Sequence, residues 1–464
     1  MTYNNVGKRH PKVVVIGAGS LFFGRQSIWQ MVHSPHLNQG TLALVDTNED
    51  RLRRMLKLAR MVVEASGVKL RVEGSTDRRD VLKGADFVVL SFAQNTVKYR
   101  DIDCRISEKY GIRMCSGDTI GPGGIFRAMR DLPVIMECAR DIGALCPDAW
   151  VINYINPSAV NGIALSRYAP KLKSFALCDG LHMPKMKDEF AVRAGIVESV
   201  ETITADIDAR FDLRIAGVNH FTWMLKAEYD GRDVMPEIGE SIRREAVRLT
   251  DGGDTGAKAQ HNAAVGYELY RAFGYVPTCV GHTKEYVRFW QGIGTMSEGI
   301  PPLGIWSAPE RYKRHEAMWE DVDAFVSGRR PIGEYMTAYG PDHATDIIES
   351  MVGGLGKSFY INTTNRGAVT NMADDAFLEL CCVPTMDGLE RLPVGEMPRG
   401  LRGMQELVLD SHELTAQAVV EQDFGKLRRA MMTDPLVQSI HDADRIIAEL
   451  LELEREAIPA GWYE

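Results

Sequence analysis

Four short polar segments of the chain combine residue types that can carry out chemistry. The first, residues 115–127, is a glycine-rich loop with a single carboxylate, Asp118. A carboxyl group in such a loop can act as a general acid, although a solvated aspartate in a structural loop shows the same pattern. In the second, residues 151–157, the amides Asn153 and Asn156 follow an apolar run. Ligands bind at such strand ends in open α/β sheets, and strand-end asparagines are also typical helix caps.

The third segment, residues 178–182, also follows an apolar run. Its Cys, Asp and His side chains are of the types that ligate a divalent metal, whereas a buried thiol followed by a helix cap is the structural alternative. In the fourth segment, residues 217–223, the lone His220 is either a ligand or a hydrogen-bonded core residue. A fifth cluster, residues 281–288, brings five polar side chains into one or two turns: His282, Lys284, Glu285, Tyr286 and Arg288.

The elements that would position these segments alternate between strands and helices in the first half of the chain. Apolar, β-branched runs predict strands at 12–16, 41–45, 70–72, 85–91, 149–154 and 174–177. Helical periodicity follows the first strand up to about residue 33 and recurs at 51–66, 124–145 and 157–168. Strands that alternate with helices predict an α/β fold with a doubly wound, parallel sheet of the Rossmann type.

The turn after the first strand, Gly17-Ala18-Gly19-Ser20, could hold a dinucleotide. Gly17 permits a tight turn, and Gly19 would let a pyrophosphate approach the N-terminus of the helix. Asp46 ends the second strand, 27 residues after Gly19, where an acid commonly binds the adenine ribose hydroxyls. Position 22 is Phe instead of Gly, so the motif departs from the usual fingerprint. The acid favours NAD over NADP, and the nearby Arg51 argues the other way.

The second half has a different character. An alternating pattern predicts an antiparallel strand at 203–215, and the run at 222–229 with Asp230-Gly231 after it predicts a hairpin. Long amphipathic patterns predict helices at 257–273, 310–325, 343–354, 402–422 and 435–456. We therefore expect a nucleotide-binding domain over 1–190 and an α+β domain over 191–464. The apolar face of the last helix fits a core or a dimer interface, and a homo-oligomer (dimer or tetramer) is expected.

Composition narrows the classes of function. The 464 residues carry 54 Lys and Arg against 63 Asp and Glu, a formal net charge of −9. A mildly acidic chain is a poor partner for nucleic acid or an anionic membrane, so we expect a small-molecule ligand, held by a local cluster if it is anionic. The eight cysteines form no CxxC pair, and no apolar run approaches the length of a membrane-spanning helix. Without a secretory signal, the sequence predicts a cytoplasmic enzyme with reduced thiols.

Seven motifs, in order along the chain, resemble those of glycoside hydrolase family 4, the NAD- and metal-dependent glycosidases. They are VVVIGAGSLFFG, GDTIGPGGIFRAMRDLPV, WVINYINPSAV, CDGLH, GVNHFTW, GHTKEY and NRGAVTN. The ordered set is more specific than any single motif. The chain is most similar to the branch that acts on acidic sugars, such as the α-galacturonidases, and to the related NAD-dependent sulfoquinovosidases.

The resemblance implies a mechanism that differs from the two-carboxylate scheme of most glycosidases. NAD takes a hydride from the sugar C3, and the resulting ketone acidifies the C2 proton. A base removes that proton, the aglycon leaves C1 by elimination, water adds back, and the hydride returns to C3. A Mn²⁺ ion on the C2 and C3 oxygens stabilises the enediolate.

The same resemblance implies a set of site residues. The metal ligands would be Cys178 and His220. Asp118 would be the acid that protonates the leaving group, and Asn156 would bind the sugar hydroxyls. The base that removes the C2 proton would be Tyr286 or His282. The expected cofactor residues are Gly17, Gly19, Ser20, Leu21, Phe22, Asp46, Ser91, Gln94 and Asn153. The cations expected at an anionic group on the sugar C6 are Lys284, Arg288 and Arg127.

One departure from the family pattern affects the substrate. Cys178 is followed by Asp179-Gly180, with His182 displaced, where the acidic-sugar branch usually has His. The usual uronidase motif is therefore broken, which favours a sulfoquinovoside over an α-hexuronide. A phospho-α-glucoside is the third alternative.

A different class of enzyme also fits part of the pattern. An NAD-dependent 2-hydroxyacid dehydrogenase would use His220 as its base and Arg127 as its carboxylate clamp, and it would consume NAD, whereas the glycosidase recycles it. A redox sensor that binds NAD without turnover is a further alternative. The motifs GDTIGPGG and GVNHFTW would be superfluous in a dehydrogenase, so they favour the glycosidase.

Overall fold

The structure, a computed structural model, describes residues 10–20, 24–178, 181, 185–251, 257–290 and 303–464. The expected cofactor residues Leu21 and Phe22, together with Asp179, Gly180 and His182 of the third segment, lie outside the described residues.

The N-terminal half contains the expected doubly wound sheet. Its strands lie in the order β3-β2-β1-β4-β5-β6, and each neighbouring pair is parallel. β1, β2, β4 and β5 are almost wholly buried, which accounts for their continuous Val, Ile and Leu runs. The fold class is confirmed, as are six strands: β1 Lys12–Ile16, β2 Thr41–Val45, β3 Arg71–Ser75, β4 Phe87–Leu90, β5 Trp150–Asn153 and β6 Lys173–Ala176.

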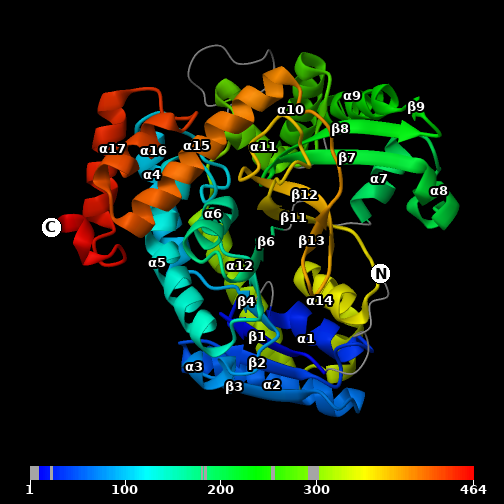
Figure 1. Cartoon of the computed structure of the whole chain (residues 1–464), viewed down its shortest axis with the longest axis vertical. Helices are drawn as coiled ribbons and strands as arrows, with labels where there is room; N and C mark the ends of the chain where they lie inside the picture. The colour runs from blue at the N-terminus through cyan, green and yellow to red at the C-terminus, as the bar shows by residue number, and fades with distance from the viewer. Residues whose placement is uncertain (1–9, 21–23, 179–180, 182–184, 252–256, 291–302) are drawn as a thin grey trace.

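Helices connect these strands (Figure 1). The second of them begins where the Asn48 side chain accepts the Arg51 N–H, at 3.0 Å, and ends at Gly67 in a left-handed conformation. The helix at 96–109 was not predicted, because its sequence, TVKYRDIDCRISEK, is dominated by charged residues. The helices of this half are α1 Gly24–His33, α2 Glu49–Ser66, α3 Arg79–Leu82, α4 Thr96–Lys109, α5 Gly121–Leu145, α6 Ser158–Tyr168 and α7 Lys185–Arg193.

The predicted strand at 203–215 is wrong in its first part. Residues Ala205–Arg210 form helix α8, whose first turn is capped by the Thr204 hydroxyl, and strand β7 starts only at Phe211 and runs to Val218. Ala205, Ile207 and Ala209 alternate with polar residues, and this alternation suggested a strand where the chain forms a short helix. The predicted hairpin is confirmed, because β7 pairs antiparallel with β8, Phe221–Tyr229, which turns at Asp230-Gly231 into β9, Arg232–Asp233.

Two strands near residue 360 and residue 380 join the halves into one sheet. β11, Phe359–Thr364, pairs with β6 through Asn362 and Ala176, and β12, Phe377–Pro384, pairs with both β11 and β7. The remaining described strands lie at the edges of this half: β10 Val276–Pro277 and β13 Leu389–Arg391. The metal and sugar candidates of the second half are therefore fixed to the nucleotide half by a continuous hydrogen-bonded sheet.

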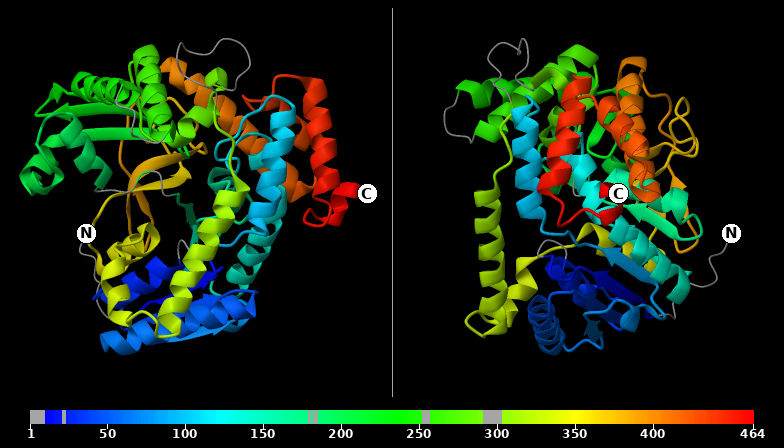
Figure 2. Two further views of the ribbon diagram at one scale, coloured as in Figure 1. Left: turned by 180° about the vertical axis from the view of Figure 1, so that it is seen from behind. Right: turned by 90° about the vertical axis from the view of Figure 1, so that its left-hand side faces the viewer.

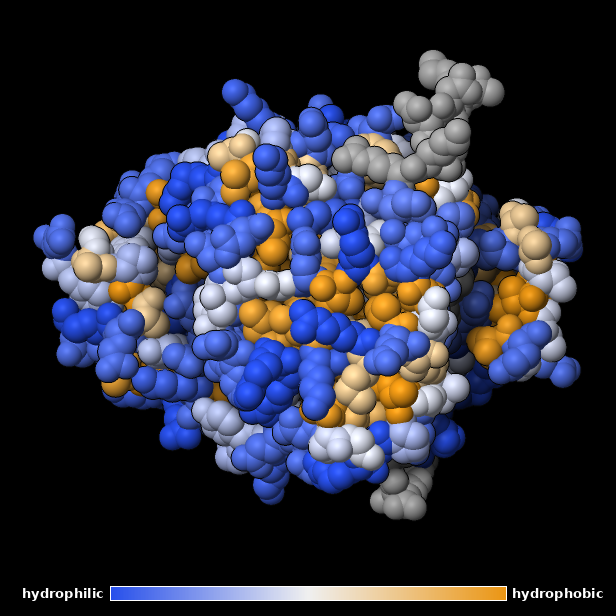
Figure 3. Space-filling view, turned by 90° about the horizontal axis from the view of Figure 1, so that it is seen from below, coloured by the Kyte–Doolittle hydropathy of each residue, from blue (hydrophilic) through white to orange (hydrophobic). Residues whose placement is uncertain are grey.

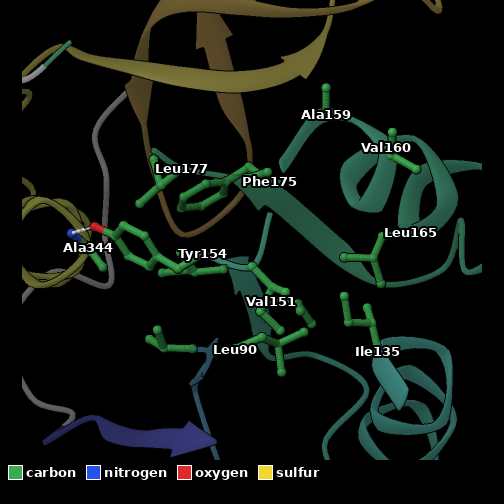
Figure 4. Packing of buried hydrophobic residues seen from close by; sticks show 14 of the residues in the cluster. Leu90, Ile135, Val151, Tyr154, Ala159, Val160, Leu165, Phe175, Leu177 and Ala344 are labelled. Carbon is green, nitrogen blue, oxygen red and sulfur yellow. Dashed lines mark hydrogen bonds between the residues drawn. The ribbon is translucent and has the colours of Figure 1, made fainter. Parts of the chain in front are cut away.

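The core continues between the halves at the ends of β5 and β6. Leu90, Val151 and Phe175 pack together there, beside the ring of Tyr154 (Figure 4). The Tyr154 hydroxyl accepts a hydrogen bond from the Ala344 N–H at 2.8 Å, at the start of helix α14, His343–Gly353. This contact ties a helix of the second half to the strand end that carries the candidate residues.

All five long helices predicted in the second half are present. The C-terminal helices lie against α4 and α5 of the first half (Figure 2). Ile446, Ile447 and Leu450 of the last helix are buried within the chain, whereas Ile440 is 60% exposed, so most of its apolar face belongs to the core. The helices are α9 Met235–Asp251, α10 Ala257–Phe273, α11 Val280–Tyr286, α12 Ala308–Val326, α13 Ile332–Ala338, α14 His343–Gly353, α15 Arg399–Glu421, α16 Phe424–Thr433 and α17 Ile440–Leu453.

The outer surface is mixed. Seen from below, hydrophobic side chains form separate patches between hydrophilic ones (Figure 3). Within the described part of the chain, none of the helices combines the length and the apolar character needed to cross a bilayer.

Candidate active site

The carboxyl ends of the parallel strands meet at one edge of the sheet. Gly17, Asp46, Ser91 and Cys178 follow β1, β2, β4 and β6 directly or by one residue, and Asn153 ends β5. The strand order reverses between β1 and β4, and nucleotides bind at such a switch point in doubly wound sheets. The structure therefore brings these expected residues to the same edge.

The turn after β1 requires its glycines. Gly17 has φ +95°, and a Cβ there would lie 2.3 Å from the Ser91 carbonyl oxygen. The Gly19 N–H donates to Asp46 Oδ2 at 2.8 Å, and a Cβ on Gly19 would lie 2.7 Å from the same oxygen. Ser20 is half-buried and closes the turn through its N–H, which donates to the Gly17 carbonyl at 2.9 Å. The turn and the acid are thus one rigid unit.

The other expected cofactor residues differ in the hydrogen bonds that their side chains make. Ser91 is 5% exposed, and its Oγ has no hydrogen-bond partner among the described residues, so the site fits a bound polar ligand. Gln94 Nε2 donates to the Arg130 carbonyl at 2.9 Å. The Asn153 amide bonds the backbone of Ile155 at 2.9 and 3.2 Å. Gln94 and Asn153 therefore brace their own loops.

Cys178 and His220 face each other beyond the end of β6. Cys178 Sγ lies 2.6 Å from His220 Nε2 and 3.9 Å from Asn156 Oδ1. Burial holds the pKa of His220 well below its usual value, so the ring is neutral and can ligate a cation. The thiol and the imidazole fit a divalent transition metal. The described residues form no larger cluster of His, Cys, Asp and Glu of this kind, so further ligands would be amide, substrate or solvent oxygens.

The position of His220 is set by three elements. It lies in the turn between β7 and β8 with φ +63°. Its N–H donates to Glu379 Oε2 of β12 at 3.1 Å, and its carbonyl accepts the Thr283 hydroxyl of α11 at 3.0 Å. Cys279 Sγ lies 3.4 Å from Nδ1, the nitrogen that faces away from Cys178. Contacts of this kind orient a ligating histidine.

Asp118 lies in a buried cluster of charged groups. Its Oδ2 is 2.7 Å from Arg127 Nη1, 3.2 Å from Arg100 Nη1 and 3.3 Å from Asn156 Nδ2, and the Ser116 hydroxyl donates to Oδ1 at 2.8 Å. Burial alone would raise the pKa of Asp118, but Arg100 and Arg127 hold it well below its usual value. The expected role of proton donor does not suit this environment, because the group is ionised at neutral pH.

Glu285, to which the motifs assigned no role, holds the loop that carries Asp118. Its Oε1 accepts the Gly117 N–H at 2.8 Å, and its Oε2 accepts the Ser116 N–H at 2.9 Å. Burial raises the pKa of this carboxyl to about 7. Neither Glu285 nor Arg100 could be assigned from motifs, since the partners of Glu285 are backbone groups 168 and 169 residues away and Arg100 lies on the helix that was not predicted.

The two candidate bases have different surroundings. The ring of His282 stacks on that of His220, with centroids 4.1 Å apart and planes 8° apart. The Tyr286 hydroxyl is buried and donates to the Asn219 carbonyl at 2.8 Å. Burial raises the pKa of Tyr286 well above its usual value. His282 therefore lies beside the metal candidates, whereas Tyr286 serves the packing of the His220 turn.

The three cations expected at an anionic substituent have different surroundings. Arg127 contacts Asp118, as described above. Lys284 is buried, with Nζ 3.3 Å from His261 Nδ1 of α10, and Arg288 is exposed. Arg127 contacts the cluster around Asp118 directly.

Comparisons with known proteins match most of the chain to the same family. Residues 12–191 match the model of the Family 4 glycosyl hydrolase, and residues 215–437 match that of the Family 4 glycosyl hydrolase C-terminal domain. The "Probable 6-phospho-beta-glucosidase" of Bacillus subtilis (strain 168) is 29% identical over 451 residues, 97% of each chain. An alpha-galacturonidase of the same organism is 25% identical and covers 95% of this chain and 97% of its own.

A solved structure shows the same fold. The 6-phospho-alpha-glucosidase from gut microorganisms in complex with NAD and Mn²⁺ is similar with a TM-score of 0.79 and 21% identity, over 97% of this chain and 99% of the other. Because both family models match in order and together span most of the sheet and its helices, the chain belongs to glycoside hydrolase family 4 and is a glycoside hydrolase.

Proposed function

We propose that this enzyme hydrolyses glycosides of an anionic sugar with NAD and a divalent metal as recycled cofactors. The position of Asn156 is the observation on which the proposal rests. Its Oδ1 lies 3.9 Å from the Cys178 thiol and its Nδ2 lies 3.3 Å from Asp118. One amide thus links the candidate metal ligands to the arginine-rich cluster, at the edge of the sheet where a nucleotide would bind.

The residues present fit both cofactors. Gly17, Gly19 and Asp46 form the rigid turn, and Ser91 offers a buried hydroxyl without a described partner. Similar proteins support the assignment, since the 6-phospho-alpha-glucosidase named above was solved with NAD and Mn²⁺. NAD held there would accept and return the C3 hydride, and a metal at Cys178 and His220 would polarise the C2 and C3 oxygens.

We assign the C2 base to His282. A base must be able to accept a proton near the operating pH and must lie beside the reacting carbon. The ring of His282 lies against His220, whereas the hydroxyl of Tyr286 is turned to the Asn219 carbonyl. The base would accept the C2 proton, while Asn156 holds a neighbouring hydroxyl of the sugar.

The substrate proposal is a sulfoquinovoside first, with an α-hexuronide and a phospho-α-glucoside as alternatives. All three place an anion on C6, which suits the arginines around Asp118. An alpha-galacturonidase is among the similar proteins. The Asp179-Gly180 pair after Cys178 departs from the uronidase pattern, and this departure supports the sulfonate over the carboxylate.

Hydrolysis of three nitrophenyl glycosides tests the proposal: the α-sulfoquinovoside, the α-galacturonide and the α-glucoside. Each is assayed after removal of bound nucleotide, with and without NAD⁺ and Mn²⁺. We expect release that needs catalytic NAD⁺, without accumulation of NADH, and that is fastest for an anionic sugar. Equal rates without NAD⁺ would overturn the mechanism, and preference for the glucoside would overturn the anionic substrate.

A further inference from the structure

A buried glutamine interrupts the apolar face of helix α15. Leu401 and Val408, one turn before and one turn after it, are almost fully buried, and Gln405 itself is 0% exposed. Helical spacing favours an apolar residue at this position, because burying an amide is costly unless its oxygen and its nitrogen both have partners. The sequence motifs gave Gln405 no role, so its function must be read from the groups that its amide binds.

Both partners of the Gln405 amide are backbone groups of the turn that carries His220. Oε1 accepts the Val218 N–H at 2.6 Å, and Nε2 donates to the Phe221 carbonyl at 2.6 Å. Val218 and Phe221 are paired at the point where β7 ends and β8 begins. One side chain, 187 and 184 residues away from its two partners, therefore holds both ends of the two-residue turn.

The backbone of this turn has an uncommon conformation. The structure describes both turn residues, and only the second, His220, has a positive φ, of +63°. The turns that two-residue hairpins favour have a positive φ at the first residue. The Phe221 carbonyl also lies so close to Gly217 that a Cβ there would be 2.3 Å from its oxygen. Backbone conformations of this kind persist where the surrounding structure fixes them.

Three further side chains bind the backbone between the two ends of the turn. Helix α11 contributes the hydroxyls of Thr283 and Tyr286, and β12 contributes the carboxylate of Glu379. The amide of Gln405 adds a fourth contact, from α15, and it spans both ends. The direction of the His220 ring is thus set by side chains from three separate elements of the second half.

We infer that Gln405 is a positioning residue for the metal ligand His220. The inference rests on the proposed function, because it takes Cys178 and His220 as the metal ligands. Nε2 of His220 lies 2.6 Å from the Cys178 sulfur, and the ring can keep this direction only if the backbone of the turn is fixed. Gln405 fixes that backbone before a metal binds, as partners of a ligating histidine do in other metal sites.

The test compares Gln405→Met with Ser411→Ala on the same helix. Methionine is close to glutamine in size and removes both hydrogen bonds to the turn. Ser411 is 1% exposed, and its hydroxyl donates to the Ala430 carbonyl of α16 at 3.1 Å, so its loss weakens the packing of α15 alone. Calorimetric titration of the metal-free, NAD-loaded enzyme with Mn²⁺ and with Co²⁺ gives the affinities.

We expect Gln405→Met to bind both metals about 10- to 100-fold more weakly than wild type. The visible absorption of bound Co²⁺, which depends on the geometry of its ligands, should shift as well. Ser411→Ala should bind both metals as wild type does. Gln405→Glu keeps the oxygen that accepts the Val218 N–H and removes the donor to Phe221, so its affinity should lie between those of wild type and Gln405→Met. Unchanged metal affinity in Gln405→Met, or an equal loss in Ser411→Ala, overturns the inference.

Hydrogen exchange of the metal-free protein gives a readout that does not depend on a metal. The amides of residues 218–221 should exchange at least about tenfold faster in Gln405→Met, with the amides of β4 unchanged. If wild type binds neither metal, the proposed metal site fails, and exchange then decides the rest. Unchanged protection of residues 218–221 refutes the hold of Gln405 on the turn, whereas faster exchange confined to that segment supports it.

Discussion

Glu285 Oε1 accepts a hydrogen bond from the Gly117 N–H at 2.8 Å, and this contact joins helix α11 to the loop of Asp118. The other carboxyl oxygen accepts the neighbouring Ser116 N–H at 2.9 Å. Because two successive backbone N–H groups donate to the same carboxyl, both the position and the orientation of the loop are fixed. The candidate base His282, three residues before Glu285, and the arginine cluster are therefore held in one fixed relation.

Replacement of Glu285 by Gln tests this relation. A glutamine places an NH₂ group where one of the two N–H donors needs an acceptor, so one buried donor loses its partner. We expect the free energy of unfolding to fall by about 1–3 kcal/mol and kcat/KM to fall about 10²-fold through displacement of the loop. NAD⁺ affinity should be unchanged. The control is Glu268→Gln, which breaks a surface pair with Arg271, and wild-type kcat/KM in Glu285→Gln would contradict the positioning role.

Asp118→Asn should reduce hydrolysis of good and poor leaving groups by the same factor. Asp118 is ionised between Arg100 and Arg127. Its loss therefore removes the anion that holds the two arginines in place, and it does not remove a proton donor. Removal of one partner from a buried ion pair costs about 3–5 kcal/mol of unfolding free energy. Rates for a series of aryl glycosides with leaving groups of different pKa measure the effect. A loss confined to the poor leaving groups would return Asp118 to the role of general acid.

His282 and Tyr286 can be separated by exchange at the sugar C2. In D₂O the wild-type product should carry deuterium at C2, because the base exchanges its proton with solvent. His282→Gln should lower the rate at which deuterium appears at C2 by about 10²- to 10⁴-fold. Tyr286→Phe should retain this rate but reduce the stability of the protein. Deuterium at C2 is read by NMR of the released sugar. Incorporation that survives in His282→Gln and vanishes in Tyr286→Phe would assign the base to Tyr286.

Cys178→Ser should weaken binding of Mn²⁺ or Co²⁺ by at least about 10²-fold. The sulfur lies 2.6 Å from His220 Nε2, so a metal held by this pair loses one of its two described protein ligands. Calorimetric titration of metal-free protein gives the affinity, and Cys381→Ser, at a half-buried position on β12, is the matched control. Unchanged affinity in Cys178→Ser would remove that residue from the metal site.

The sequence predicted those parts of the fold that depend on local pattern. The buried strands β1, β2 and β4 were recognisable because residues buried on both faces must all be apolar, and the turn after β1 was recognisable by Gly17 and Gly19. β11 and β12 were missed, since their alternation is weak and their pairing partners lie far away in sequence.

Some residues of the site were likewise recognisable from local motifs, whereas others were not. Cys178 and His220 could be paired through motifs, but Glu285 and Arg100 reach the site through loop and helix packing that no short motif encodes. The motifs offered Lys284 as a cation for the anionic group of the sugar, and its side chain lies buried beside His261.

A second buried charge network, which joins the second motif to the C-terminal segment, makes stability depend on pH. Arg130 lies between Asp103, 2.8 Å from Nη2, and Glu454 of the C-terminal segment. Burial and the nearby charge of Asp103 raise the pKa of Glu454 from an ordinary 4.5 to about 9. Across that interval the folded protein holds a proton that the unfolded chain has lost. The free energy of unfolding therefore falls as the pH rises, by up to about 1.4 kcal/mol per pH unit.

Glu454→Gln should remove this dependence. The glutamine keeps the size and neutrality of the protonated carboxyl, so the variant should lose less stability than wild type between pH 6 and about 9. Thermal unfolding midpoints measured across that range give the slopes. Glu452→Gln, an exposed residue two positions earlier that pairs with Arg455, should retain the wild-type slope. Equal slopes in all three proteins would show that Glu454 is already ionised in the folded state, and that Arg130 offsets both carboxylates.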